Sequence, residues 1–137
     1  MIDETVLTNW APRALAILRI VAAVLFIEHG SMKLFGFPAS ASPTPFQLFS
    51  LIGLSGVLEF FGGLLLLLGL LTRPTAFVLS GEMAVAYFMA HSTRSFFPAL
   101  NQGDSAVLFC FVFLYFVFAG PGAWSLDGAR RRRLITA

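Results

Sequence analysis

Residues 51–71 read LIGLSGVLEFFGGLLLLLGLL and contain a single charged side chain, Glu59. The hydrocarbon core of a bilayer is about 30 Å thick, and a helix that rises about 1.5 Å per residue crosses it in roughly 20 residues. This stretch has that length, and it ends at the turn-forming sequence Thr72-Arg73-Pro74. It therefore predicts a membrane-spanning helix.

The composition of the whole chain agrees with this prediction. Of the 137 residues, 58% are hydrophobic and 12% are charged, whereas a soluble domain has roughly 45–50% and 25%. Such a chain has too few polar side chains to cover a water-facing surface. We therefore expect an all-α integral membrane protein.

Three further apolar runs have the length of a span and are bounded by proline, glycine or polar residues. They occupy about residues 13–35, 75–91 and 104–119. Together with residues 51–71, they predict a four-helix bundle within a membrane domain of residues 13–120. Residues 1–12 form a short segment before it, and residues 121–137 form a basic tail after it.

The basic residues predict the orientation of these spans. Four spans place both termini on one side, which collects Arg13, Arg73 and the run Arg130 to Arg133. The opposite side has only Lys33 and Arg94. Because cytoplasmic loops carry the excess of Lys and Arg, we expect both termini in the cytoplasm.

The sequence argues against two other interpretations, a cleaved signal peptide and a nucleic-acid-binding protein. The first apolar run has no small-residue cleavage pattern, so we expect it to be a permanent span and not a signal peptide. The basic residues do not alternate with aromatic residues on one surface, which argues against nucleic-acid binding.

Ionisable side chains inside spans are costly and usually mark a site. Counting residues from the span ends places several of them at one level in the outer half of the bundle. They are His29, Lys33, Glu59, His91 and Asp104, which come from all four spans. Helical phase, about 100° per residue, directs His29, Lys33 and Glu59 inward and Glu28 away from them. We expect a polar pocket there.

The residue types suggest roles within this pocket. A histidine beside a carboxylate exchanges protons with a substrate, so we assign His29 and Glu59 as the catalytic pair. Lys33, His91 and Asp104 would bind the substrate. Tyr115 shares a helical face with Asp104 and is assigned to the same binding role.

Two more charged residues lie nearer the inner side. Arg19 is about 9 Å in from Arg13, and Glu82 is about 13 Å in from Arg73, at 1.5 Å per residue. The similar depths predict an ion pair between Arg19 and Glu82 that fixes the packing of two helices. No spacing such as HExxH suggests a metal site.

An ordered set of motifs resembles the DoxX family of small bacterial membrane proteins. The motifs are HGSMKLFG, GVLEFFGGLLLLLGLLTRPTA, GEMAVAYFMAHS, NQGD and GPGAWSLD, and they cover about residues 13–127. The resemblance implies a four-helix membrane protein of the oxidoreductase type, named for a subunit of quinol-oxidising or thiosulfate:quinone-linked complexes. The matching positions are His29, Gly30, Lys33, Glu59, Gly63, Arg73 and His91.

The sequence also departs from this family pattern. NQGD replaces a stretch of the type NGGE, so Asp104 is shorter than the carboxylate that the family has there. The paired redox cysteines of some relatives are not matched, since Cys110 is the single cysteine.

We therefore predict a protein of the bacterial inner membrane that is a quinone-interacting subunit or small oxidoreductase of respiratory or redox metabolism. No flavin, haem or iron–sulfur motif is visible, so electrons would come from the substrate, from a quinone or from a partner redox subunit. A homodimer is also left open. The alternative is a protein that binds, transports or isomerises a lipid or small molecule, or a non-catalytic assembly subunit.

Overall fold

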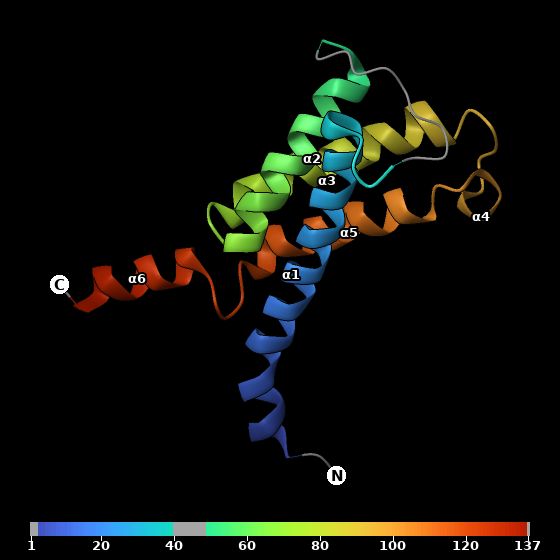
Figure 1. The fold of residues 1–137 in the computed structure, drawn as a ribbon. Coiled ribbons are helices and arrows are strands. Elements are labelled where there is room, and N and C mark those ends of the chain that lie inside the picture. The colour runs from blue at the N-terminus through green and yellow to red at the C-terminus, as the bar shows by residue number, and fades with distance from the viewer. Residues whose placement is uncertain (1–2, 40–48, 137) are drawn as a thin grey trace.

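The computed structural model describes residues 3–39 and 49–136, and the regular secondary structure in this part of the chain is all helical (Figure 1). The helices are α1 (Glu4–Phe35), α2 (Leu51–Leu68), α3 (Thr72–Ala86), the π-helix η1 (Tyr87–His91), α4 (Pro98–Asn101), α5 (Asp104–Ala119) and α6 (Leu126–Thr136). The predicted all-α class is confirmed. Two of the helices, α1 and α2, are long and apolar enough to cross a membrane, and α5 is a shorter apolar helix.

Helix α1 begins nine residues before the predicted span at Arg13. Its first turn is capped by Asp3, whose side chain accepts a hydrogen bond from the backbone N–H of Thr5 at 3.0 Å. Pro12 therefore lies inside the helix and does not open it. The helix ends at Gly36, which has the left-handed conformation with φ of 67° that favours glycine.

The helices pack as two pairs, α1 with α2 and α3 with α5. In Figure 1, α3 and α5 run side by side and cross α1, whose N-terminal part extends beyond the other helices. The pairs meet at aromatic side chains. Phe26 on α1 makes edge-to-face contacts with Phe109 and Phe113 on α5, with ring centroids 5.0 and 4.6 Å apart.

Small residues allow the close contact between α1 and α2. A Cβ atom on Gly30 would lie 2.4 Å from the backbone nitrogen of Phe60, and one on Gly63 would lie 3.1 Å from the carbonyl oxygen of Ala23. Neither position has room for a larger residue. The small residues thus let the backbones of α1 and α2 approach closely, as they do between helices in membranes.

Arg19 holds together the end of the molecule at which α2 turns into α3. This side chain is fully buried, and all five of its N–H donors face backbone carbonyls. The acceptors are the carbonyl oxygens of Leu66, Leu67 (2.8 Å), Pro121 (2.8 Å), Ala123 (3.4 Å) and Trp124 (3.0 Å). Arg19 thereby satisfies the last carbonyls of α2 and fixes the loop that follows α5.

Asp127 completes the same end of the molecule. Its carboxylate accepts hydrogen bonds from the backbone N–H groups of Leu71 and Thr72, both at 2.9 Å, and so caps the start of α3. Burial alone raises the pKa of the Asp127 carboxyl, but the N–H groups of Thr72 and Leu71 outweigh it and hold the pKa below its usual value. The motif GPGAWSLD therefore forms a structural connection between α5, α2 and α3.

Candidate functional site

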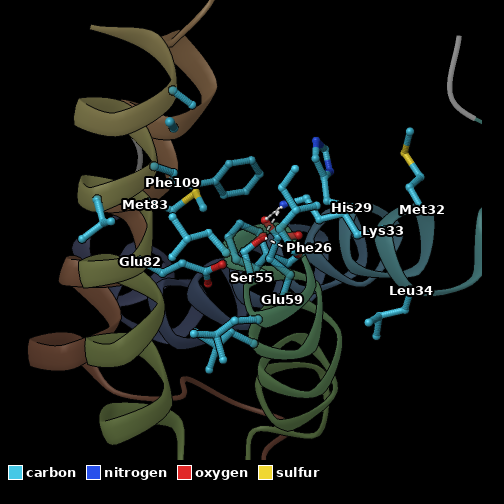
Figure 2. Close-up of a pocket in the computed structure, with 18 of the residues that line it drawn as sticks. Phe26, His29, Met32, Lys33, Leu34, Ser55, Glu59, Glu82, Met83 and Phe109 are labelled. Carbon is cyan, nitrogen blue, oxygen red and sulfur yellow. Dashed lines mark hydrogen bonds and ion pairs between the residues drawn. The ribbon is translucent and has the colours of Figure 1, made fainter. Parts of the chain in front are cut away.

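A cavity of about 1250 Å³ lies between α1, α2, α3 with η1, and α5. Most of its lining side chains are apolar, including Phe26, Met83, Met89 and Phe109. Its polar lining comes mainly from His29, Lys33, Ser55, Glu59, Glu82, His91 and Ser105. Figure 2 shows the central part of this lining. An apolar cavity with a few convergent polar groups is typical of a small-molecule site.

An ion pair between Lys33 and Glu59 lies at the centre of the polar part. The ammonium Nζ lies 2.6 Å from Glu59 Oε1 and donates a second hydrogen bond to Ser55 Oγ at 3.0 Å. Ser55 and Glu59 are four residues apart on α2 and therefore share one face. Gly56 lies between them, and its missing side chain leaves room for the Lys33 stem. The local sequence SGVLE thus positions the pair.

The two members of this pair differ in their exposure. The Glu59 side chain is 4% exposed, whereas that of Lys33 is 29% exposed. Lys33 uses two of its three N–H donors within the protein, which leaves one for a ligand. Because Lys33 is the more accessible member, it is the group that a ligand would meet first.

Several carboxylate oxygens in the cavity have no hydrogen-bond donor among the described residues. They are Oε2 of Glu59 and both oxygens of Glu82, and all three are buried. In Figure 2 the Glu82 side chain extends from α3 toward Ser55 and Glu59 on α2. Buried polar atoms normally have partners, so these three acceptors are unusual.

The predicted pair between Arg19 and Glu82 is not formed. Arg19 donates to backbone carbonyls at the end of α2, and Glu82 lies in the cavity instead. The prediction compared depths along helices that were taken to be parallel. In the structure α3 crosses α1, so equal residue counts from the helix ends do not give equal positions (Figure 1).

His29 lines the cavity but is not bonded to Glu59. Its Nδ1 lies 2.9 Å from the carbonyl oxygen of Leu25, one turn earlier on α1. A carbonyl accepts only from a protonated nitrogen, so Nδ1 carries a hydrogen, and in a neutral ring Nε2 is then the acceptor. The carboxylate partner that the sequence predicted for His29 is held by Lys33 instead. Glu28 is exposed and lies outside the lining, as its helical phase predicts.

His91 reaches the cavity from the π-helix. Its Nδ1 lies 3.1 Å from the carbonyl oxygen of Asn101, and its ring stacks on Tyr87 with centroids 6.5 Å apart. Asn101 is itself buried, and its amide donates to the carbonyl oxygen of Ser95 at 2.6 Å. Asn101 therefore fixes the loop behind His91, a role that the sequence analysis missed, although NQGD had drawn attention to this segment.

Asp104 and Tyr115 do not line the cavity. The face of α5 that was predicted to point inward is the exposed one, and Phe111 and Tyr115 on it are 64% and 56% exposed. The side of α5 that lines the cavity contains Ala106 and Phe109. Because phenylalanine lies on every side of α5, its sequence gives no apolar stripe from which to choose a face.

Metal ligands are not gathered in the described part of the chain. Among residues 3–39 and 49–136, no group of three His, Cys, Asp or Glu side chains has the proximity that holds a metal ion. The described residues of the cavity lining combine one lysine, two carboxyl groups and two imidazoles with apolar walls. This set can bind the polar head of an apolar molecule and exchange protons with it.

Composition, helices and cavity together define a small all-helical membrane protein. The DoxX family model matches residues 14–92, and the chain belongs to this family. Similar proteins include an uncharacterized protein of Haemophilus influenzae, 46% identical over 130 residues that cover 88% of this chain and 93% of the relative. No solved structure matches the chain significantly.

Two other relatives carry names that describe their location. Inner membrane protein YqjF of Escherichia coli is 31% identical over 122 residues, which cover 80% of this chain and 85% of the relative. The uncharacterized membrane protein Rv3486 of Mycobacterium tuberculosis is 28% identical over 148 residues, which cover 89% and 84% of the two chains. The predicted family and the predicted membrane location are confirmed.

Proposed function

We propose that this protein is a four-span inner-membrane protein with both termini in the cytoplasm, and that its cavity binds a quinone. Four helical segments support the topology, namely α1, α2, α3 continued by η1, and α5. The basic residues support the orientation, since the run Arg130 to Arg133 lies in α6 beyond the last of these segments.

The observation that carries the quinone proposal is the Lys33–Glu59 pair within a cavity whose walls are mostly apolar. A quinone has an apolar body and two carbonyl oxygens that accept hydrogen bonds. Lys33 has one N–H donor left for such an oxygen, and its distance of 2.6 Å from Glu59 fixes the ammonium in place. Apolar side chains such as Phe26 and Phe109 offer a surface for the ring.

The protein groups in this site account for protons and not for electrons. Reduction of a quinone to a quinol takes up two electrons and two protons at the two carbonyl oxygens. Glu59, Glu82 and His29 are groups that exchange protons. The two electrons come from a partner redox protein, so the chain acts as a quinone-binding subunit.

Direct measurement of quinone binding tests this proposal. Protein purified in mild detergent should bind a short-chain ubiquinone, measured by isothermal titration calorimetry. Lys33→Met should weaken binding at least about tenfold, because a hydrogen bond to a charged donor contributes roughly 1.5–3 kcal/mol. Arg94→Met removes a cation from the loop after η1, outside the cavity lining, and should bind the quinone normally.

The double variant Lys33→Met/Glu59→Gln separates ligand binding from folding. It removes the ammonium without leaving an ionised carboxylate unpaired, so thermal unfolding should stay close to that of the parent protein while quinone binding is lost. Unfolding unchanged and binding retained in this variant would disprove the role of Lys33. Absence of binding to the unmodified protein would disprove the proposed function itself.

A further inference from the structure

The hydrogen-bonding groups that face the cavity are mostly acceptors. Glu59 Oε2 and both oxygens of Glu82 have no donor among the described residues. In the neutral form of His29 and His91 the Nε2 atom is an acceptor too, since each Nδ1 lies at a backbone carbonyl. Lys33 is the single charged donor among the described lining residues, and it is already engaged with α2. A ligand that complements this cavity brings donors or positive charge.

The charges lead to the same conclusion. Lys33 balances one carboxylate, Glu59, at 2.6 Å. The second carboxyl group, that of Glu82 on α3, faces Glu59 on α2 and Lys33 on α1. The two histidines lie on α1 and η1. The part of α5 that lines the cavity brings Ser105, Ala106 and Phe109 and therefore no charge. With both carboxyl groups ionised and both imidazoles neutral, the described lining has one negative charge in excess.

A buried carboxylate without a partner is costly in a medium of low dielectric constant. Glu82 escapes this cost in one of two ways, by binding a proton or by pairing with a cation. Glu59 adds a third oxygen without a donor, Oε2, and the Glu59 side chain is almost completely buried. The proton and the cation are alternatives, because either one neutralises the same excess charge.

We propose that the cavity binds a hydrophobic organic cation, whose charge lies against Glu82 and Glu59, in exchange for a proton. This inference goes beyond quinone binding and rests on the buried oxygens of Glu82 and Glu59 that have no hydrogen-bond donor among the described residues. The O–H bond of the protonated Glu82 carboxyl is the only covalent bond that breaks, and its proton passes to solvent as the cation takes its place.

The walls of the cavity suit such a ligand. Phe26 and Phe109 present aromatic surface, which attracts organic cations. Met83 and Met89 add flexible, polarizable side chains that adapt to ligands of different shape. The volume of about 1250 Å³ accommodates an ion with several aromatic rings. We therefore expect affinity for bulky apolar cations and weak affinity for small hydrophilic amines.

Binding of tetraphenylphosphonium to the purified full-length protein tests the proposal. The charge of this ion does not depend on pH, so any pH dependence of its binding arises in the protein. Affinity, measured by isothermal titration calorimetry, should rise with pH as the competing proton becomes scarce. Titrations in buffers of different ionisation enthalpy should detect release of up to one proton per bound cation.

Variants of the carboxyl groups identify the binding group. Glu82→Gln should weaken tetraphenylphosphonium binding at least tenfold and remove its pH dependence, while Glu82→Asp, which keeps the charge, should retain both. Glu28→Gln is the matched control, because it makes the same chemical change at an exposed position outside the cavity. Its binding should stay within about twofold of the parent protein.

The Lys33→Met variant distinguishes this inference from the proposed function. Removal of the ammonium frees Glu59 for the cation, so tetraphenylphosphonium should bind more tightly while the quinone binds less tightly. Equal binding to the parent protein and Glu82→Gln would overturn the inference, as would equal affinity for the neutral analogue triphenylphosphine oxide. Either result leaves quinone binding to be judged by its own titration.

Discussion

At the scale of single residues, Arg19 shows how a charge inside an apolar helix is stabilised without a carboxylate. Its five N–H groups reach the backbone carbonyls at the end of α2 and in the loop after α5. The carbonyls of a helix end carry partial negative charge and need donors. A buried guanidinium with a complete set of acceptors therefore joins two segments that are far apart in the sequence.

Arg19→Met is expected to destabilise the protein by at least about 3 kcal/mol, because several buried carbonyls lose their donor. Arg19→Lys, with three donors, should have an intermediate effect. The measurement is equilibrium unfolding in mixed detergent micelles. Because Arg19 and Glu82 are not partners, the effects of Arg19→Met and Glu82→Gln should add. A coupling energy well above about 0.5 kcal/mol would instead support the ion pair that the sequence predicted.

The site residues could be predicted from the sequence where a single charged residue shares a helix face with small residues. Lys33 and Glu59 share faces with Gly30 and with Gly56 in their helices, and the structure joins them. Glu82 was assigned to the wrong partner because depth along a helix does not show how two helices cross. Asp127 was missed because its function, capping α3 from another segment, depends on a contact distant in sequence.

At the scale of elements, glycine determines how closely α1 and α2 approach. The backbone of α1 at Gly30 lies against the backbone of α2 at Phe60, and no side chain separates them. Gly30 lies three residues before Lys33 on α1, and Phe60 directly follows Glu59 on α2. The distance between the two helices therefore also sets the length of the Lys33–Glu59 ion pair. A change at Gly30 should therefore affect both the stability of the protein and the geometry of its cavity.

Gly30→Ala is expected to destabilise the protein by about 2 kcal/mol, because the new methyl group overlaps the Phe60 backbone and the helices must separate. Gly81→Ala on α3 is the control, since a Cβ there meets no atom within 4 Å. It should leave stability unchanged or raise it by up to about 1 kcal/mol. Thermal unfolding of both variants in detergent measures the difference, and equal midpoints would contradict the close contact.

The helices also show where the periodicity of the sequence no longer predicts which face is buried. In α1 and α2, small residues gather on one side, and that side is the buried one. In α5, large apolar residues lie on every side, and the predicted inward face with Asp104 and Tyr115 is exposed. In a membrane, hydrophobicity does not distinguish a lipid-facing side chain from a packed one, so only size and polarity carry information about the face.

At the scale of the whole molecule, the helices differ in how well their lengths match a bilayer. Helix α2 has 18 residues and α5 has 16, which correspond to about 27 and 24 Å at 1.5 Å per residue. The hydrocarbon core is about 30 Å thick. A four-span arrangement therefore requires local thinning of the bilayer around α5 or an interfacial position for the polar ends of the helices.

The proposed topology predicts which positions meet each side of the membrane. In a Cys110→Ala background, single cysteines are placed in turn by Thr8→Cys on α1, Thr93→Cys after η1, and Ile135→Cys on α6. In intact cells a membrane-impermeant maleimide should label only the Thr93→Cys protein. In inside-out vesicles it should label the Thr8→Cys and Ile135→Cys proteins, because an even number of spans returns the chain to its starting side.

Other labelling patterns would identify the segment that fails to span. If α5 lay in the interface and did not cross, Ile135→Cys would react from the side opposite to Thr8→Cys, since three spans would remain. If α3 with η1 also failed to cross, the termini would again share a side, but Thr93→Cys would react together with them. The cavity lies between α1, α2, α3 and α5, so either pattern would also place one of its walls outside the hydrocarbon core and change the dielectric environment of Glu82.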